Sequence, residues 1–153
     1  MDRRQKLKMY DTDYYQWTQQ QVDAMRRQEL QLIDWQNLIE EIEGLGKSEK
    51  RKLESYLARL LDHLLKLSFW ESERSYNKRH WETEVANFRF EIEKILKENP
   101  SLGNLVEPIW NEIYDKRVKV MSRSFSIPNH PQIPLIKALD EDWFPNADAG
   151  SAP

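Results

Sequence analysis

The feature that most constrains this chain is a run of leucines between positions 53 and 67. They recur at intervals of three and four residues, which is the spacing of one face of an α-helix. The face comprises Leu53, Leu57, Leu60, Leu61 and Leu64. Tyr56, Leu65 and Leu67 widen it to about half of the circumference, and a face that wide needs neighbours on two sides. We therefore predict a central helix over residues 48–69, capped by Ser48.

Apolar spacing predicts further helices over residues 13–27, 34–43, 80–97 and 99 to about 120, and a short one over 134–139. Asp34 is a suitable N-cap for the second helix, and Gly44 is placed to end it. The apolar residues of that helix share one side: Trp35, Leu38, Ile39 and Ile42. Pro108 should kink or split the fifth helix. The fold class that follows is all-α, a four- to five-helix bundle with a proline-rich, mostly irregular C-terminal tail.

The length of 153 residues suits one domain with a sizeable core. We expect a flexible basic N-terminus over residues 1–10, a single helical domain over 11–145 and a disordered tail over 146–153. The absence of Cys excludes disulfides and thiolate chemistry. No secretory signal and no apolar run of membrane-spanning length is present, so we predict a cytoplasmic protein without a membrane partner.

The stretch GLGKSEK, residues 44–50, has the Gly-Lys-Ser ending of a phosphate-binding loop. Such a loop needs glycine at position 41, where this chain has Glu41, and it follows a β-strand rather than a helix. We interpret Gly44 and Gly46 as a break between two helices. We predict no nucleotide site here.

Three carboxylates lie close together in the stretch NLIEEIE, but successive helical positions point them in separate directions. The Glu-x-x-His pattern of di-metal bundles is also missing. The sequence therefore predicts neither a metal nor a cofactor.

His63 lies at the edge of the leucine face, where a hydrogen-bonded structural histidine is the simpler interpretation. A functional role, such as a small-ligand pocket, would require a second polar group from another helix. Glu41 and Arg89 are the candidates for that group.

Arg74 and His80 are separated by a spacing that some all-α ribonucleases of the HEPN group use. Here the two residues fall in a polar stretch, residues 71–80, that we expect to connect two helices. Basic runs such as RRQKLK and KSEKRK could contact phosphates, although nearby carboxylates favour ordinary solvated faces.

Three aromatic residues are candidates for an interaction surface. Phe90 points almost opposite to the apolar stripe of its predicted helix, so it is covered either by the proline-rich tail or by a second chain. Trp143 and Phe144 stand beside three acidic residues. We expect these two to pack back on the bundle and anchor the tail.

Several segments together carry a resemblance to a known family. They are DTDYYQWTQQQ, DWQNLIEEIEGLGKSEKRKLESYLARLLDHLLKL, HWETEVANFRFEI, NPSLGNLVEPIWNEIY and ALDEDWFP, in that order. The chain resembles, over roughly residues 11–145, the bacterial family catalogued as domain of unknown function 29. The resemblance implies an α-helical bacterial protein without an established activity, and it transfers no catalytic residues.

These observations favour a non-catalytic interaction or adaptor protein, whose partner is another protein or a second copy of the chain. The alternative is an RNA- or DNA-directed activity, either binding or nuclease, that uses Arg74 and His80. The sequence leaves open whether the chain is an enzyme.

Overall fold

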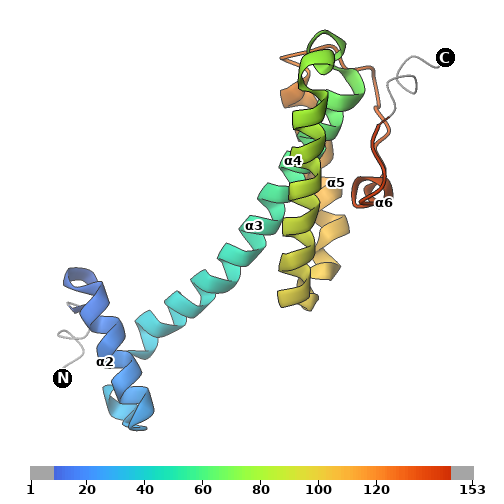
Figure 1. Cartoon of the computed structure of the whole chain (residues 1–153). Coiled ribbons are helices and arrows are strands. Elements are labelled where there is room, and N and C mark those ends of the chain that lie inside the picture. The colour runs from blue at the N-terminus through green and yellow to red at the C-terminus, as the bar shows by residue number, and fades with distance from the viewer. Residues whose placement is uncertain (1–8, 146–153) are drawn as a thin grey trace. The chain divides into compact units, whose positions relative to one another are not determined.

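A computed structural model describes residues 9–145, and every regular element in that range is helical (Figure 1). The elements are α2 (Tyr14–Arg26), η1 (Leu30–Leu32), α3 (Trp35–Phe69), α4 (Glu71–Glu98), η2 (Pro100–Leu102), α5 (Gly103–Met121) and α6 (Leu135–Ala138). The predicted all-α fold is confirmed. The predicted flexible N-terminus and disordered tail fall largely on residues 1–8 and 146–153, which lie outside the described residues.

The chain divides into two compact units, which we call the N-terminal unit (residues 1–48) and the C-terminal unit (residues 49–153). Helix α3 begins in the first and ends in the second. The expectation that residues 11–145 form a single domain concerns cooperative folding and stays a prediction.

The leucine face of α3 forms the centre of the C-terminal unit, as predicted. The members of that face are fully buried: Leu53, Leu57, Leu60, Leu61, Leu64 and Leu65. Helix α4 contributes Val85 and Ile92 to the same core, and α5 contributes Ile109 and Trp110. The three helices lie side by side in Figure 1. Two neighbouring helices therefore cover the wide apolar face.

A buried polar cluster holds the N-terminal unit together. The Asp34 carboxylate accepts hydrogen bonds from Trp17 Nε1 at 3.0 Å and from Asn37 Nδ2 at 2.8 Å. It also accepts one from the backbone N–H of Asn37, as an N-cap does. Gln21 Oε1 accepts from the backbone N–H of Asp34. The predicted cap at Asp34 is thus present, and it also joins α2 to the start of α3.

The predicted helix break at Gly44 and Gly46 is wrong, and Ser48 is not a cap. Helix α3 continues through all three positions. Neither glycine has a positive φ, so nothing in the backbone uses the freedom that makes glycine a helix terminator. Helical spacing of apolar residues also continues on both sides of this segment, which favours one long helix.

Two other predicted boundaries also differ. Helix α4 begins at Glu71, so the stretch 71–80 is helical rather than a polar connection. Acidic side chains in its first turn, Glu71 and Glu73, favour a helix N-terminus. Pro108 does not split α5, which runs from Gly103 to Met121 as one helix. The predicted short helix over 134–139 is present as α6.

Candidate functional site

Arg89 from α4 binds the C-terminal tail. Its side chain is nearly buried, and Nε donates to Ala138 O at 2.7 Å while Nη2 donates to Trp143 O at 2.8 Å. The guanidinium also lies 5.0 Å from the centre of the Phe144 ring. Burial lowers the pKa of Arg89. All of its hydrogen-bond acceptors are main-chain carbonyls, so this arginine fixes the path of the tail.

The tail aromatics pack against the bundle, as the sequence predicts. Trp143 and Phe144 are partly buried against the core of the C-terminal unit, and Lys137 Nζ lies 5.9 Å from the centre of the Trp143 ring. Tyr114 fixes the tail further upstream, because its hydroxyl donates to Pro131 O and accepts from Ile133 N at 3.0 Å. A role of Trp143 and Phe144 in binding another chain stays a prediction.

His63 makes local contacts. Its Nδ1 hydrogen-bonds to Arg59 O at 2.9 Å, and its ring meets the Phe88 ring edge-on at 5.0 Å between centres. Because a carbonyl only accepts, Nδ1 carries the proton in this bond. Burial lowers the pKa of His63. Within residues 9–145 no hydrogen bond or ion pair joins His63 to Arg89, which is occupied by the tail. A polar site made of these two residues is therefore not assembled in this structure.

Arg74 and His80 are both on α4, six positions apart, which places them about 120° apart around the helix. The guanidinium of Arg74 donates to the main-chain oxygens of Leu67 and Ser68 at the end of α3. This contact closes the turn between α3 and α4. His80 is exposed. The nuclease pair stays a prediction, and the two hydrogen bonds of Arg74 give it a structural role at the turn between α3 and α4.

Phe90 lies beside an open groove of about 970 Å³ between α4 and the tail. Its lining includes the apolar residues Leu96 and Leu139 and the charged residues Lys97 and Asp142. Phe90 itself is 61% exposed, so the tail runs beside it without covering it. Its role as an interaction residue stays a prediction.

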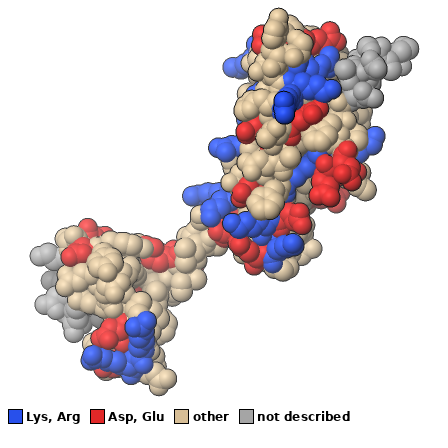
Figure 2. Space-filling model, in the orientation of Figure 1, with Lys and Arg blue, Asp and Glu red and all other residues tan. Residues whose placement is uncertain are grey.

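Another exposed apolar surface is on α3, in the N-terminal unit. We define the α3 apolar face as four residues whose side chains are each more than half exposed: Trp35 (53%), Ile39 (51%), Ile42 (60%) and Leu45 (68%). At 100° per residue they lie within about 120° of one another around the helix. Figure 2 shows broad tan areas, free of Lys, Arg, Asp and Glu, over this unit. Four large apolar side chains on one side of one helix form a patch rather than scattered exposure.

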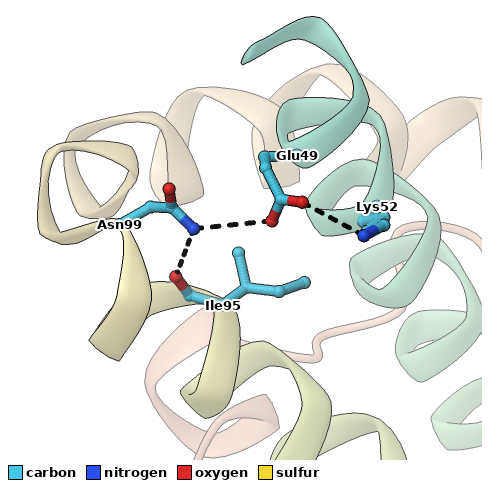
Figure 3. A network of polar contacts seen from close by, with 4 residues as sticks. All are labelled: Glu49, Lys52, Ile95 and Asn99. Atoms are coloured by element: carbon cyan, nitrogen blue, oxygen red, sulfur yellow. Dashed lines mark hydrogen bonds and ion pairs between the residues drawn. The ribbon is translucent and has the colours of Figure 1, made fainter. Parts of the chain in front are cut away.

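The α3 apolar face repeats the pattern of the buried leucines. Trp35, Ile39 and Ile42 each stand 18 residues, or five helical turns, before Leu53, Leu57 and Leu60. Helix α4, which covers the buried leucines, ends before Asn99. There, Asn99 Nδ2 donates to Ile95 O at 3.0 Å and to Glu49 Oε2 at 3.5 Å (Figure 3). Lys52 holds the other oxygen of the same carboxylate at 3.0 Å. Every residue from 42 to 48 is exposed.

One edge of the α3 apolar face is closed by α2 and the turn before it. Tyr10 donates to Glu41 Oε1, and Tyr14 donates to Glu41 Oε2 at 2.6 Å. The hydrogen bond to Glu41 raises the pKa of Tyr10 to about 12. The same two phenols lower the pKa of Glu41. The Tyr10 and Tyr14 rings also contact Trp17.

Apolar spacing placed Trp35, Ile39 and Ile42 on one side of a helix, but it did not include Leu45 and did not predict that this side is exposed. The predicted break at Gly44 hid the five-turn repetition, because it assigned the two sets of apolar residues to separate helices. Periodicity shows which side of a helix is apolar, yet it does not show whether another element lies against that side.

Two further observations concern the described residues as a whole. No helix among them is both long and apolar enough to cross a bilayer. In the same part of the chain, no group of three or more His, Asp or Glu side chains is placed to hold a metal ion.

The family model described as "Domain of unknown function DUF29" matches residues 9–144. No curated protein and no solved structure matches the chain.

Proposed function

The chain belongs to the DUF29 family, whose function is unknown, and we propose that it is a non-catalytic, cytoplasmic interaction protein. Its binding surface is the α3 apolar face. The observation that supports this is the exposure of Trp35, Ile39, Ile42 and Leu45 on one side of a helix. The same pattern, five turns later, is fully buried by other helices.

Covering this face would supply enough free energy for specific binding. Full burial of one large apolar side chain contributes about 1.5–3 kcal/mol. The four side chains of the face are each more than half exposed. Their combined burial would therefore offset a substantial part of the entropic cost of bringing two chains together.

The distribution of exposed apolar residues also supports this location. Among the described residues, fourteen large apolar side chains are exposed, and ten of them lie between Tyr14 and Leu45. The C-terminal unit has more than twice as many residues but only four: Tyr76, Phe90, Val120 and Ile136. A binding role for the N-terminal unit accounts for this difference.

Site-specific photocrosslinking in cells of the source organism tests the proposal. A benzophenone amino acid replaces Leu45 on the α3 apolar face, and the matched control places it at Ile136, which is 82% exposed on α6. We expect discrete adducts from position 45 and none of the same size from position 136. Equal adduct patterns at the two positions, or none at position 45, would show that the face is not a docking surface.

The RNA- or DNA-directed alternative makes a different prediction. It requires Arg74 to leave its two main-chain acceptors and contact phosphate. Gel-shift and nuclease assays at two salt concentrations test it, because phosphate binding weakens steeply as salt rises.

A further inference from the structure

The α3 apolar face is continued by exposed apolar residues of α2. Tyr14, Val22 and Met25 are 50%, 36% and 41% exposed. At 100° per residue they lie within about 80° of one another around α2. Next to them around the same helix are the residues that α2 buries, which are Trp17, Gln21 and Ala24. Helix α2 therefore carries an exposed apolar side beside its buried side, as the start of α3 does.

The two exposed sides lie on the same side of the helix pair. The helices run antiparallel, because Trp17 bonds to Asp34 at the start of α3 while Tyr14 bonds to Glu41 two turns later. On α2 the exposed apolar side lies about 90° beyond the buried side in the direction of increasing residue number. On α3 it lies roughly 90–120° beyond the side that carries Asn37 and Glu41. Antiparallel helices turn in opposite senses when viewed from one end, so these similar rotations bring both apolar sides to one side of the pair.

The area of this combined surface matches one side of a stable dimer. The surface, which we call the hairpin face, consists of the α3 apolar face together with Tyr14, Val22 and Met25. Its side chains are between 36% and 68% exposed. Aromatic side chains bury about 150–250 Å² and aliphatic ones somewhat less, so the hairpin face exposes on the order of 700 Å². A specific interface buries about 800 Å² on each partner, and polar residues at the rim would supply the remainder.

The charges around the hairpin face do not oppose a second copy. The part of each helix surface that carries the exposed apolar residues contains no Asp, Glu, Lys or Arg. On the side away from α2, the nearest charged residues of α3 carry both signs, Glu43 and Lys47. Residues 1–48 carry nine Asp and Glu against seven Lys and Arg, so two copies bring little like-charge repulsion together. An uncharged centre with a polar rim is typical of interfaces between identical chains.

The N-terminal unit buries little of its own apolar surface. Ten large apolar side chains are exposed in its described part, whereas the buried apolar residues there are Trp17, Ala24 and Ile33. Units of about 40 residues usually need a disulfide, a metal ion or association for stability, and this chain contains no Cys. Residues 1–8 and 146–153, which lie outside the described residues, contain Met1 and Leu7 as their only large apolar residues. Neither segment has enough apolar side chains to cover the hairpin face.

We propose that the hairpin face binds the same face of a second copy of this chain, so that two helix pairs form a four-helix bundle. Each copy supplies α2 and the first part of α3, and the same residues contribute on both sides of a two-fold interface. Helix pairs that pack through their apolar sides are the building plan of such bundles. This inference rests on the proposed function and adds the identity of the partner.

Sedimentation velocity of the full chain tests the inference. Association of two copies follows mass action, so the diluted protein is a single chain and the concentrated protein is a dimer. We expect the mass to rise to that of two chains as the protein concentration increases from about 1 to about 200 µM. A mass of one chain at every concentration would overturn the inference. A series of larger species would also overturn it, because a closed two-fold interface ends at two chains.

Nearly isosteric variants test whether both helices take part. Val22→Thr on α2 and Ile42→Thr on α3 each add a hydroxyl to the hairpin face and keep a β-branched side chain. A hydroxyl without a partner is costly to bury, and each copy contributes one, so each variant should weaken dimerisation at least tenfold. Ile136→Thr, at an exposed apolar position on α6, is the matched control and should leave dimerisation unchanged. Far-UV circular dichroism checks that all three variants remain helical.

An unchanged equilibrium in either hairpin-face variant would overturn the two-helix interface. The crosslinking experiment then separates this inference from the proposed function. A benzophenone at position 45 should give an adduct with the mass of two chains. Adducts of other masses alone would assign the face to a different protein, which overturns this inference and leaves the proposed function standing. Absence of adducts from position 45 would refute that function itself.

Discussion

The two halves of α3 carry the same pattern of large apolar residues and differ in what lies against them. In the C-terminal unit, Leu53, Leu57 and Leu60 are fully buried by α4 and α5. In the N-terminal unit, their counterparts Trp35, Ile39 and Ile42 are more than half exposed. The first set therefore belongs to the core, whereas the second leaves large apolar side chains exposed.

The two units also differ in what holds them together. The C-terminal unit has one continuous core of leucine, isoleucine, valine and aromatic side chains. The described N-terminal unit has few buried apolar residues, Trp17, Ala24 and Ile33, beside the polar cluster around Asp34. Because a small unit buries little apolar surface, this unit gains little stability from burial and depends more on its hydrogen bonds. A partner that covers the α3 apolar face would supply that burial.

The largest expected effect compares equivalent positions on the two halves of α3. Leu60→Ala leaves a cavity in the core and should cost about 2–5 kcal/mol in the free energy of unfolding. Ile42→Ala, five turns earlier, should change it by less than about 0.5 kcal/mol, because the side chain is exposed in the single chain. Urea titration of both variants measures the difference. Equal losses would mean that Ile42 is covered in the protein in solution.

This comparison also shows what could be predicted from the sequence. The leucine face, the all-α fold and the return of Trp143 and Phe144 to the bundle followed from spacing and apolar character. The break at Gly44 did not occur, because glycine can take helical φ as well as positive φ. The tail contacts of Arg89 had no sequence signal, since they are bonds to main-chain oxygens. The exposure of the α3 apolar face depends on which other elements lie against it, and the periodicity of a single helix gives no information about those elements.

The second prediction concerns the tail, which covers part of the C-terminal core. Arg89→Met removes the hydrogen bonds to Ala138 O and Trp143 O and should cost about 2 kcal/mol of stability. Truncation after Ala138 should destabilise the chain as well. If Arg89 acts by holding the tail, the double change should cost clearly less than the sum of the two single changes. Additive losses would show that Arg89 stabilises the bundle independently of the tail.

The third prediction concerns the exposed segment of α3. Gly44→Ala together with Gly46→Ala should stabilise the helix locally by about 1 kcal/mol per residue, because both positions are helical and unobstructed. Amide hydrogen exchange over residues 42–50 measures this as slower exchange. Gly103→Ala, at the first residue of α5, is the control and should have a smaller effect. Unchanged exchange in the double variant would mean that the segment is already held by something outside the chain.

The smallest expected effect concerns His63, at the border of the covered half of α3. Burial lowers its pKa in the folded protein below the ordinary value of 6.5, so the unfolded chain binds the proton more readily. The resulting contribution to stability is fully present above pH 6.5 and is lost as the pH falls through the lowered pKa of the folded state.

His63→Gln removes this titration and should cost about 1 kcal/mol at pH 7.5 through the lost contact with Arg59 O. Urea titrations of both proteins between pH 7.5 and 5 measure the two effects together. The difference in unfolding free energy between wild type and variant should shrink on acidification, because only the wild type loses the pH-dependent contribution of His63. A difference that stays constant over this range would show that His63 does not titrate differently in the folded and unfolded states.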